Sequence, residues 1–339
     1  MRAAAYQGIG DIAVVEREMS APPTGCVRLR VTSAGVCGSD LHVLGGALGD
    51  PAGMQPGHEI AGVVEAVGDG ASVAPGSHVA VEPIVACGDC VHCLALRPNL
   101  CSMGEMIGFG LPGGLAEYVD VPEETLHELP AELSTSAAGL SEPMAVGVRG
   151  ARIGQLGPGD RVGIVGAGTI GLLSIVTAKE VGAAEVVIAA RHSHQQELAR
   201  SLGADEVFAA SEELIDAVGP EHLDVVVETV GGHADTLAEA VAMVRRGGRI
   251  VVVGVFTGVV ALPGMPFFVK ELTVAASNCY ARDLGGSDFS RGVELVASHA
   301  ALIEPLVTHT FALDDVVAAF SVSGDKATRS VKVHIRPLG

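Results

Sequence analysis

The spacing of hydrophobic and polar residues along this 339-residue chain changes near residue 161. Before that point, residues 1 to about 33 alternate between apolar and polar side chains, with Pro22 and Pro23 as interruptions. This alternation predicts short antiparallel strands joined by turns, and residues 60–67 and 78–85 are predicted to be further strands. The first part of the chain is therefore predicted to be rich in β-structure.

From about Arg161 onward, short apolar runs alternate with segments of helical spacing. The runs 161–165, 185–190, 223–229 and 249–255 predict strands, and the segments 169–181, 193–202 and 234–244 between them predict helices. Such alternation is typical of a doubly wound parallel sheet with helices on its faces. A helix near 289–298 and a closing strand near 330–335 are expected to return to the first domain. The fold class is thus α/β.

Composition limits the functions to consider. A net charge of −19 and a pI near 4.9 argue against nucleic acid and anionic membranes, because a field of that sign repels phosphate groups. No apolar run is long enough to span a bilayer, and the N-terminus lacks a signal-peptide core, so we expect a cytoplasmic protein. Seven cysteines without a secretory signal favour metal or thiol chemistry over a disulfide framework.

The most specific local pattern is a group of four cysteines within fifteen residues: Cys87, Cys90, Cys93 and Cys101. Four thiolates at this spacing are typical of a closed structural zinc site, which holds a lobe together where no hydrophobic core can form. The lobe is predicted to span about residues 86–102, and His92 is not needed as a ligand. A redox CxxC pair would not require the third and fourth cysteine.

A second possible metal site combines Cys37 with His58 and Glu59, among glycines. A thiolate, an imidazole and a carboxylate can hold zinc and leave one position open for a substrate. Glu142 adds a carboxylate that could reach the metal directly or through water. Consecutive strand residues point to opposite faces, so His58 and Glu59 share one ion only if the chain bends there, and otherwise Glu59 lies outside the coordination shell.

The third pattern is a glycine-rich turn after the strand that ends at Val165. Gly166 would permit the turn, Gly168 would let a pyrophosphate approach the backbone, and Gly171 would allow close packing of helix on strand. Thr169 and Ile170 complete the predicted dinucleotide-binding turn. At the end of the next strand, Ala190, Arg191 and His192 stand where an acidic residue would bind the ribose of NAD. Arg191 and His192 can instead neutralise a 2′-phosphate, so NADP is favoured over NAD.

Over nearly its whole length the chain resembles the zinc-dependent medium-chain alcohol dehydrogenases. The matching motifs are Cys37-Gly-Ser-Asp-Leu-His42, Gly57-His-Glu-Ile-Ala-Gly62, the four-cysteine lobe and the glycine turn. Glu142 stands where the liver-type enzymes have cysteine, so the site looks like the polyol, threonine and butanediol dehydrogenase branch. The strand end at Ala190 and Arg191 is similar to that of NADP-using ketose reductases. Val43 stands where sorbitol enzymes commonly have an aromatic residue, which argues against sorbitol itself.

The resemblance implies a GroES-like catalytic domain at residues 1–148, a Rossmann domain at 149–284, and a C-terminal segment, 285–339, that completes the catalytic domain. It also implies two zinc ions per chain. Cys37 and His58 would bind the catalytic zinc, with Glu59 and Glu142 as exchangeable further ligands. Asp40 would orient His58, and Ser39 with His42 would relay the proton. The family further suggests homodimers or homotetramers joined through the Rossmann sheet edge.

The resulting hypothesis is reversible hydride transfer between a secondary alcohol or polyol and NAD(P). A 3-hydroxy amino acid such as threonine is an alternative substrate. Two rival hypotheses are a zinc-free quinone or enoyl reductase on the same fold, and a non-catalytic dinucleotide-binding protein stapled by one zinc. Five residues are candidates for the substrate pocket: Leu44, Phe109, Phe256, Asn278 and Tyr280.

Overall fold

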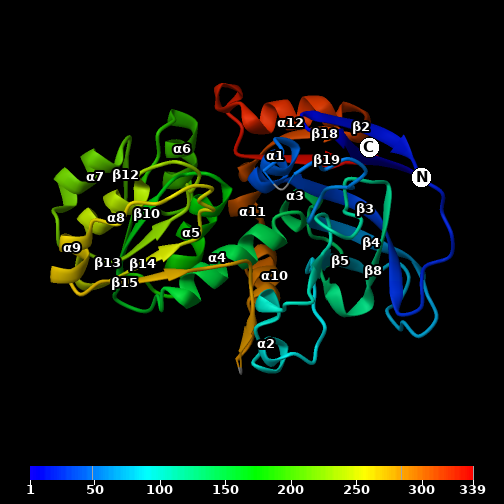
Figure 1. The fold of residues 1–339 in the computed structure, drawn as a ribbon, viewed down its shortest axis with the longest axis horizontal. Coiled ribbons are helices and arrows are strands. Elements are labelled where there is room, and N and C mark those ends of the chain that lie inside the picture. Colours follow the sequence, from blue (N-terminus) through cyan, green and yellow to red (C-terminus); the bar gives the residue numbers. More distant parts are fainter. Residues whose placement is uncertain (48, 284, 339) are drawn as a thin grey trace. The chain divides into compact units, whose positions relative to one another are not determined.

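The computed structural model describes residues 1–47, 49–283 and 285–338. The chain divides into two compact units (Figure 1). The first unit comprises Met1–Glu142 and Ala281–Gly339, and the second unit comprises Pro143–Tyr280. The second unit is therefore inserted into the sequence of the first.

The first unit is built on a seven-stranded sheet. Along the sheet the order is β18-β19-β3-β4-β5-β9, and β8 also pairs with β3. Its strands are β3 (Cys26–Val36), β4 (Glu59–Val67), β5 (His78–Val81), β8 (Tyr118–Pro122), β9 (Leu126–Glu128), β18 (Val307–Ala312) and β19 (Lys332–Arg336). The other strands of this unit form two-stranded sheets. These pair β1 (Arg2–Gly8) with β2 (Asp11–Glu16), β6 (Ile84–Val85) with β7 (Glu105–Met106), and β16 (Arg282–Asp283) with β17 (Gly286–Ser287).

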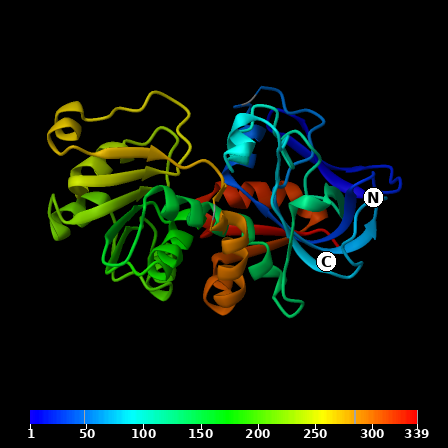
Figure 2. The same cartoon turned by 90° about the horizontal axis from the view of Figure 1, so that it is seen from below.

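The C-terminal strand β19 lies beside β3, as Figure 2 shows for the red and blue ribbons. It pairs antiparallel with β3 on one side and parallel with β18 on the other. The prediction of a closing strand that returns to the first domain is confirmed. The predicted strand 78–85 is instead two strands, β5 and β6, separated by Pro83, because proline cannot donate a backbone hydrogen bond to a ladder.

Alternation explains why β3 forms the centre of this sheet. Val27, Leu29 and Val31 are fully buried in the core, while Arg28 between them pairs with Asp120 on β8 through two hydrogen bonds of 2.8 and 2.7 Å. Short helices and turns surround the sheet. They are α1 (Gly38–Leu44), α2 (Val91–Leu94), η1 (Pro98–Leu100), η2 (Glu123–Thr125), α3 (Thr135–Ala138), α10 (Asp288–Ser298), α11 (Ala300–Ile303), η3 (Glu304–Leu306), η4 (Leu313–Asp315), α12 (Val316–Gly324) and η5 (Lys326–Thr328).

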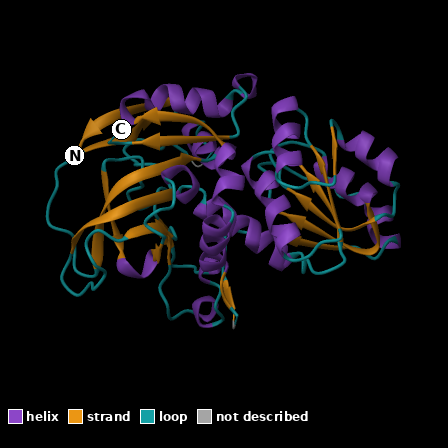
Figure 3. Ribbon diagram, turned by 180° about the vertical axis from the view of Figure 1, so that it is seen from behind, coloured by secondary structure: helices purple, strands orange, loops and turns teal. Residues whose placement is uncertain are grey.

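The second unit contains a six-stranded, wholly parallel sheet in the order β12-β11-β10-β13-β14-β15. The strands are β10 (Arg161–Val165), β11 (Glu185–Ala189), β12 (Glu206–Phe208), β13 (Leu223–Glu228), β14 (Val244–Val252) and β15 (Thr273–Ala276). The helices are α4 (Ser141–Ile153), α5 (Thr169–Glu180), α6 (Ser193–Ser201), α7 (Ser211–Val218), α8 (Thr236–Met243) and α9 (Gly264–Val269). Helices α5 and α6 contact each other, as do α7 and α8, and helices cover both faces of the sheet (Figure 3).

The predicted doubly wound sheet is therefore confirmed, although β12, α7 and α9 were not predicted and one strand was placed wrongly. The strand predicted at 249–255 begins at Val244 and ends at Val252, because Val244 already pairs with Leu223 on β13. Among the helices that the structure describes, none is both long enough and apolar enough to cross a lipid bilayer.

Candidate metal and cofactor sites

Cys37, His58 and Glu59 come together in the first unit. Cys37 follows β3 and precedes α1, His58 precedes β4, and Glu59 is the first residue of β4, paired with Gly35 across the sheet. One potential ligand atom from each of the three lies within 4.8 Å of the other two. His58 is 3% exposed and Glu59 is 1% exposed. The consecutive residues His58 and Glu59 thus direct ligand atoms to one place, as a shared metal site requires.

Asp40 on α1 supports this cluster. One of its carboxylate oxygens accepts a hydrogen bond from the backbone of Cys37 at 2.9 Å, and the other lies 3.6 Å from Nδ1 of His58. Burial by itself lowers the pKa of His58, but the charges of Asp40 and Cys37 outweigh it and raise that pKa well above its ordinary value. The site therefore attracts a positive charge, which a bound metal ion would supply in place of the proton.

Sulfur, nitrogen and oxygen donors in one cluster, with Cys37 half-buried and the other two residues buried, fit zinc. Nδ1 of His58, Oδ1 of Asp40 and Oε2 of Glu59 are buried without a hydrogen-bond partner among the described residues. Such atoms are costly to bury unless something binds them. Nδ1 of His58 and Oδ1 of Asp40 lie 3.6 Å from each other, so the atom left for a ligand is Oε2 of Glu59. Together with the donor set, this oxygen fits a divalent cation held by Cys37 and His58.

Glu59 also contacts a buried lysine that sequence analysis missed. The ammonium group of Lys332 on β19 donates to Oε1 of Glu59 at 2.6 Å and to the carbonyl of Val36 at 3.1 Å. Burial opposes the charge of Lys332, yet the neighbouring Glu59, Cys37 and Glu142 raise its pKa above the ordinary value. The sequence signal was weak, because Lys332 is one of several polar residues in the closing strand, with His334 and Arg336.

Gly35 makes room for the carboxylate of Glu59. A Cβ atom added at residue 35 would lie 1.8 Å from Oε2 of Glu59. We expect Gly35→Ala to displace that carboxylate and to lower both zinc content and kcat/KM by about tenfold or more, since strain of this kind costs about 1–3 kcal/mol. Metal analysis and steady-state kinetics on the purified variant measure both effects.

Gly38→Ala is the matched control, because a Cβ at residue 38 has no atom within 4 Å and the residue lies only three positions further along the chain. It should retain zinc and activity. Full zinc content and full activity in Gly35→Ala would contradict the steric argument.

The remaining predicted residues of this site occupy different positions. Glu142, at the start of α4, is 6% exposed but does not join the three-residue cluster. Ser39 is half-buried and His42 is exposed, both on α1.

The candidates for the substrate pocket lie in both units. The ring of Phe109 lies against that of His58, with centroids 5.1 Å apart, and Leu44 packs against the core of the first unit. Phe256 is half-buried and packs against the core of the second unit. Tyr280 is fully buried, and Asn278 lies two residues before it.

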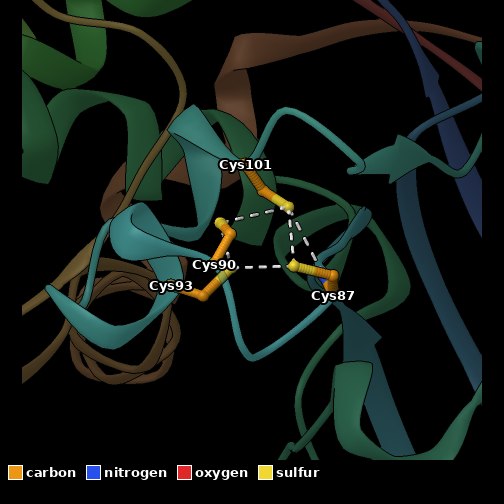
Figure 4. A group of neighbouring side chains, drawn as sticks. All are labelled: Cys87, Cys90, Cys93 and Cys101. Atoms are coloured by element: carbon orange, nitrogen blue, oxygen red, sulfur yellow. Dashed lines mark hydrogen bonds between the residues drawn. The ribbon is translucent and has the colours of Figure 1, made fainter.

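The four lobe cysteines form a second cluster (Figure 4). Their sulfur atoms approach one another at 3.4 Å (Cys87 and Cys101), 3.5 Å (Cys90 and Cys93), 3.8 Å (Cys87 and Cys93) and 3.9 Å (Cys90 and Cys101). Four sulfurs about 2.3 Å from a tetrahedral zinc would be about 3.8 Å apart. The hydrogen bonds of the neighbouring backbone lower the pKa of Cys90 to about 6. The cluster therefore fits a structural zinc ion.

The glycine turn opens α5 in the second unit. Gly166 has a φ of +97°, and a Cβ at Gly171 would lie 1.9 Å from the carbonyl oxygen of Gly166. A Cβ at Gly168, by contrast, would meet nothing within 4 Å. Thr169 and Ile170 are the first residues of α5. The turn thus needs glycine at 166 and 171 for its own packing, while Gly168 faces open space.

The end of β11 carries no carboxylate. Ala190 is buried, Arg191 is exposed, and His192 is the N-cap residue of α6. The ring of His192 stacks on that of His194, with centroids 5.7 Å apart. The structure therefore places the cationic side chain of Arg191, rather than an acidic one, directly after β11. This strand is the neighbour of β10, which leads into the glycine turn.

Comparisons with known proteins agree with this architecture. Residues 23–131 match the alcohol dehydrogenase GroES-like domain, and residues 169–298 match the zinc-binding dehydrogenase domain. A 2-dehydro-3-deoxy-L-galactonate 5-dehydrogenase from Pseudoalteromonas atlantica is 33% identical, over 95% of this chain and 94% of its own. Sorbitol dehydrogenase from Bacillus subtilis is 31% identical, over 92% and 90%. A structure described as a zinc-binding dehydrogenase from Sinorhizobium meliloti, bound to NADP, superposes with a TM-score of 0.91, 30% identity and 99% coverage of both chains.

The predicted family and fold class are thereby confirmed, together with the predicted enzyme class. Both domain matches, the intact donor set around His58 and the two relatives argue against the zinc-free and the non-catalytic hypotheses. The chain belongs to the zinc-dependent medium-chain alcohol dehydrogenases, and it is an oxidoreductase that oxidises alcohol or polyol CH–OH groups reversibly with NAD(P).

Proposed function

We propose that this dehydrogenase uses one zinc ion at Cys37 and His58 for catalysis, a second at the four lobe cysteines for structure, and NADP as the hydride carrier. The observation that carries the catalytic assignment is the cluster of half-buried Cys37 with buried His58 and Glu59, whose ligand atoms lie within 4.8 Å of one another. Metal analysis should return two zinc ions per chain.

Each residue of the first site has a defined task in this proposal. Cys37 and His58 hold the metal, and Asp40 orients His58. A zinc ion bound there would act as a Lewis acid and lower the pKa of the substrate hydroxyl. Ser39, half-buried, and His42, exposed on the same helix, carry the released proton to solvent. Glu59, anchored by Lys332, or Glu142 provides a further carboxylate ligand.

The substrate is proposed to be a polyol, a sugar acid or a diol with a secondary alcohol. This follows the relatives, which are named for 2-dehydro-3-deoxy-L-galactonate and for sorbitol. L-threonine 3-dehydrogenase from Bacillus subtilis, 28% identical, keeps a 3-hydroxy amino acid as the second candidate. A panel of sugar alcohols, cyclitols, aldonic acids, diols and L-threonine, each tested with NAD and NADP, distinguishes these classes. Turnover of threonine alone would overturn the polyol assignment.

Arg191 supports the choice of NADP. Arg191 is exposed directly after β11. An acidic residue at this position would repel a 2′-phosphate, whereas an arginine attracts it. We expect Arg191→Ala to raise the KM for NADP by about ten- to hundredfold, because a hydrogen bond to a charged group is worth about 1.5–3 kcal/mol. The KM for NAD should change by less than about threefold. Arg200→Ala, an exposed arginine on the following helix α6, should change neither value. Equal effects of Arg191→Ala on both nucleotides would refute the phosphate contact.

We also propose that the enzyme is a homodimer or homotetramer joined through β15. This strand is the last of its sheet and pairs only with β14 among the described strands. Apolar side chains are exposed just before it, including Met265 at 72% and Phe268 at 76%. Exposed sheet edges and apolar patches favour association.

Light scattering on the purified protein tests the oligomer. Phe268→Asp is expected to lower the measured mass by half or more, whereas Val91→Asp, an equally exposed apolar position on the cysteine lobe, should not. A monomeric unmodified protein would contradict the proposal.

We place the enzyme in the cytoplasm, because a reducing compartment keeps the lobe thiols available for zinc.

A further inference from the structure

Glu228, the last residue of β13, is a fully buried carboxylate with a well-defined set of partners. Its Oε1 accepts hydrogen bonds from the backbone N–H of Val230 at 2.8 Å, from that of Gly231 at 3.0 Å, and from the hydroxyl of Thr236 at 2.8 Å. Its Oε2 has no hydrogen-bond partner in the described part of the chain. Three donors on one oxygen offset much of the cost of burying a charge. Glu228 therefore fixes the loop that follows its own strand.

A close backbone approach holds this loop, residues 229–233, on its other side. Gly231 has a φ of +64°, and a Cβ there would lie 2.5 Å from the backbone nitrogen of Val255. A Cβ at Gly254 would lie 2.5 Å from Oε2 of Glu228. The amide of Gly232 donates to the carbonyl of Val255 at 2.8 Å. The loop is thus clamped between the Glu228 carboxylate and the segment after β14.

The same loop contacts the glycine turn. The hydroxyl of Thr229 donates to the carbonyl oxygens of Val165, at 2.9 Å, and Gly166, at 3.1 Å. A Cβ at Gly166 would lie 2.6 Å from Cγ2 of Val230. Displacement of Thr229 or Val230 would therefore move the backbone of the turn itself. A continuous path of contacts runs from the carboxylate of Glu228 through the loop to Gly166.

We propose that Glu228 is a positioning residue for cofactor binding: its buried carboxylate holds loop 229–233 so that Thr229 and Val230 fix the geometry of the glycine turn at Gly166. This inference rests on the proposed role of that turn in binding the dinucleotide. Glu228 acts through the loop and does not touch the cofactor. A turn held in place before binding loses less conformational freedom when the pyrophosphate arrives.

The test compares cofactor dissociation constants in the zinc-loaded enzyme, measured by fluorescence titration with NADPH and NADH. We expect Glu228→Ala to raise both dissociation constants by about tenfold, because two backbone donors of the loop lose their partner. At saturating cofactor, kcat should stay within about twofold, and zinc content should be unchanged. Glu228→Gln should restore binding to within about threefold. Its amide oxygen can replace Oε1, and its NH₂ group takes the place of an oxygen that accepts no bond.

Two further variants separate positioning from general stability. Thr229→Val removes only the hydroxyl that binds the turn and should weaken both nucleotides in the same direction, even if Glu228→Ala fails to fold. Leu223→Ala removes a fully buried side chain at the opposite end of β13 and should lower the unfolding midpoint while the dissociation constants stay near those of the unmodified enzyme.

Unchanged dissociation constants in both Glu228→Ala and Thr229→Val would overturn the inference, as would an equal weakening by Leu223→Ala. If the unmodified enzyme bound neither nucleotide, the proposed function would fail instead, so the two failures are distinguishable.

Discussion

Replacement of His58 by alanine is expected to reduce kcat/KM by at least about 10³-fold and to leave one zinc ion per chain instead of two. A metal that polarises a substrate oxygen contributes several kcal/mol, and about 4 kcal/mol corresponds to that factor. His58 is buried, and Cys37 and Glu59 alone make a poorer donor set. The matched assay combines steady-state kinetics with atomic emission on the same preparation.

His309→Ala is the control for this experiment. His309 is half-buried on β18 of the same unit and lies outside both metal clusters of the described residues. It should keep two zinc ions and nearly full activity. Full activity in His58→Ala, with metal analysis showing one zinc per chain, would refute zinc catalysis.

Replacement of Cys101 by serine is expected to unfold the lobe between Cys87 and Met103 while the rest of the fold persists. Large apolar residues are exposed here: Val91 and Leu94 in the lobe and Met103 directly after it are 73–74% exposed, so no core of its own can hold the lobe. Structural zinc in small peptides contributes about 10–16 kcal/mol of apparent binding energy at neutral pH, and that energy is folding energy. Loss of one thiolate should therefore convert the lobe to a flexible loop and lower the zinc count to one.

Limited proteolysis with chymotrypsin, followed by mass spectrometry, locates the effect. New cleavage should appear at Leu94 and Leu96 within the lobe. Cys26→Ser, at a cysteine of β3 outside both clusters, should keep two zinc ions and a resistant lobe. A protease-resistant Cys101→Ser lobe would show that packing, not metal, holds this segment.

Local patterns in the sequence were sufficient to predict the alternation of strands and helices in the second unit and the grouping of the four lobe cysteines. In the second unit, successive strands are joined by helices. The period of the hydrophobic residues therefore indicates each element, and the alternating order of strands and helices indicates a parallel sheet. The cysteines of the lobe lie within fifteen residues, so their proximity is a local property. The glycine turn was predictable for the same reason.

The partners of Glu59 were not predictable in this way. Lys332 is 273 residues away in sequence and reaches Glu59 only because β19 lies beside β3, which also pairs with β4. The need for glycine at residue 35 depends on the pairing of β3 with β4, which places Gly35 opposite Glu59. Long-range sheet order, which no periodicity encodes, places the partners of Glu59. Glu228 was not singled out from the sequence either, and for a different reason: its partners Val230, Gly231 and Thr236 are close in the chain, but an irregular loop that folds back onto a carboxylate leaves no periodic pattern.

The insertion of one unit into the sequence of the other has a consequence for synthesis on the ribosome. One edge of β3 is completed by β19, which is made about 300 residues after Val36. At roughly 5–20 residues per second, that edge waits about 15–60 s for its neighbour, while all of Pro143–Tyr280 is translated and free to fold. An open strand edge of this kind readily pairs with foreign chains. We therefore expect chaperone cover of this short stretch of β3, Ala34 to Val36, to limit aggregation of the nascent protein until translation is nearly finished.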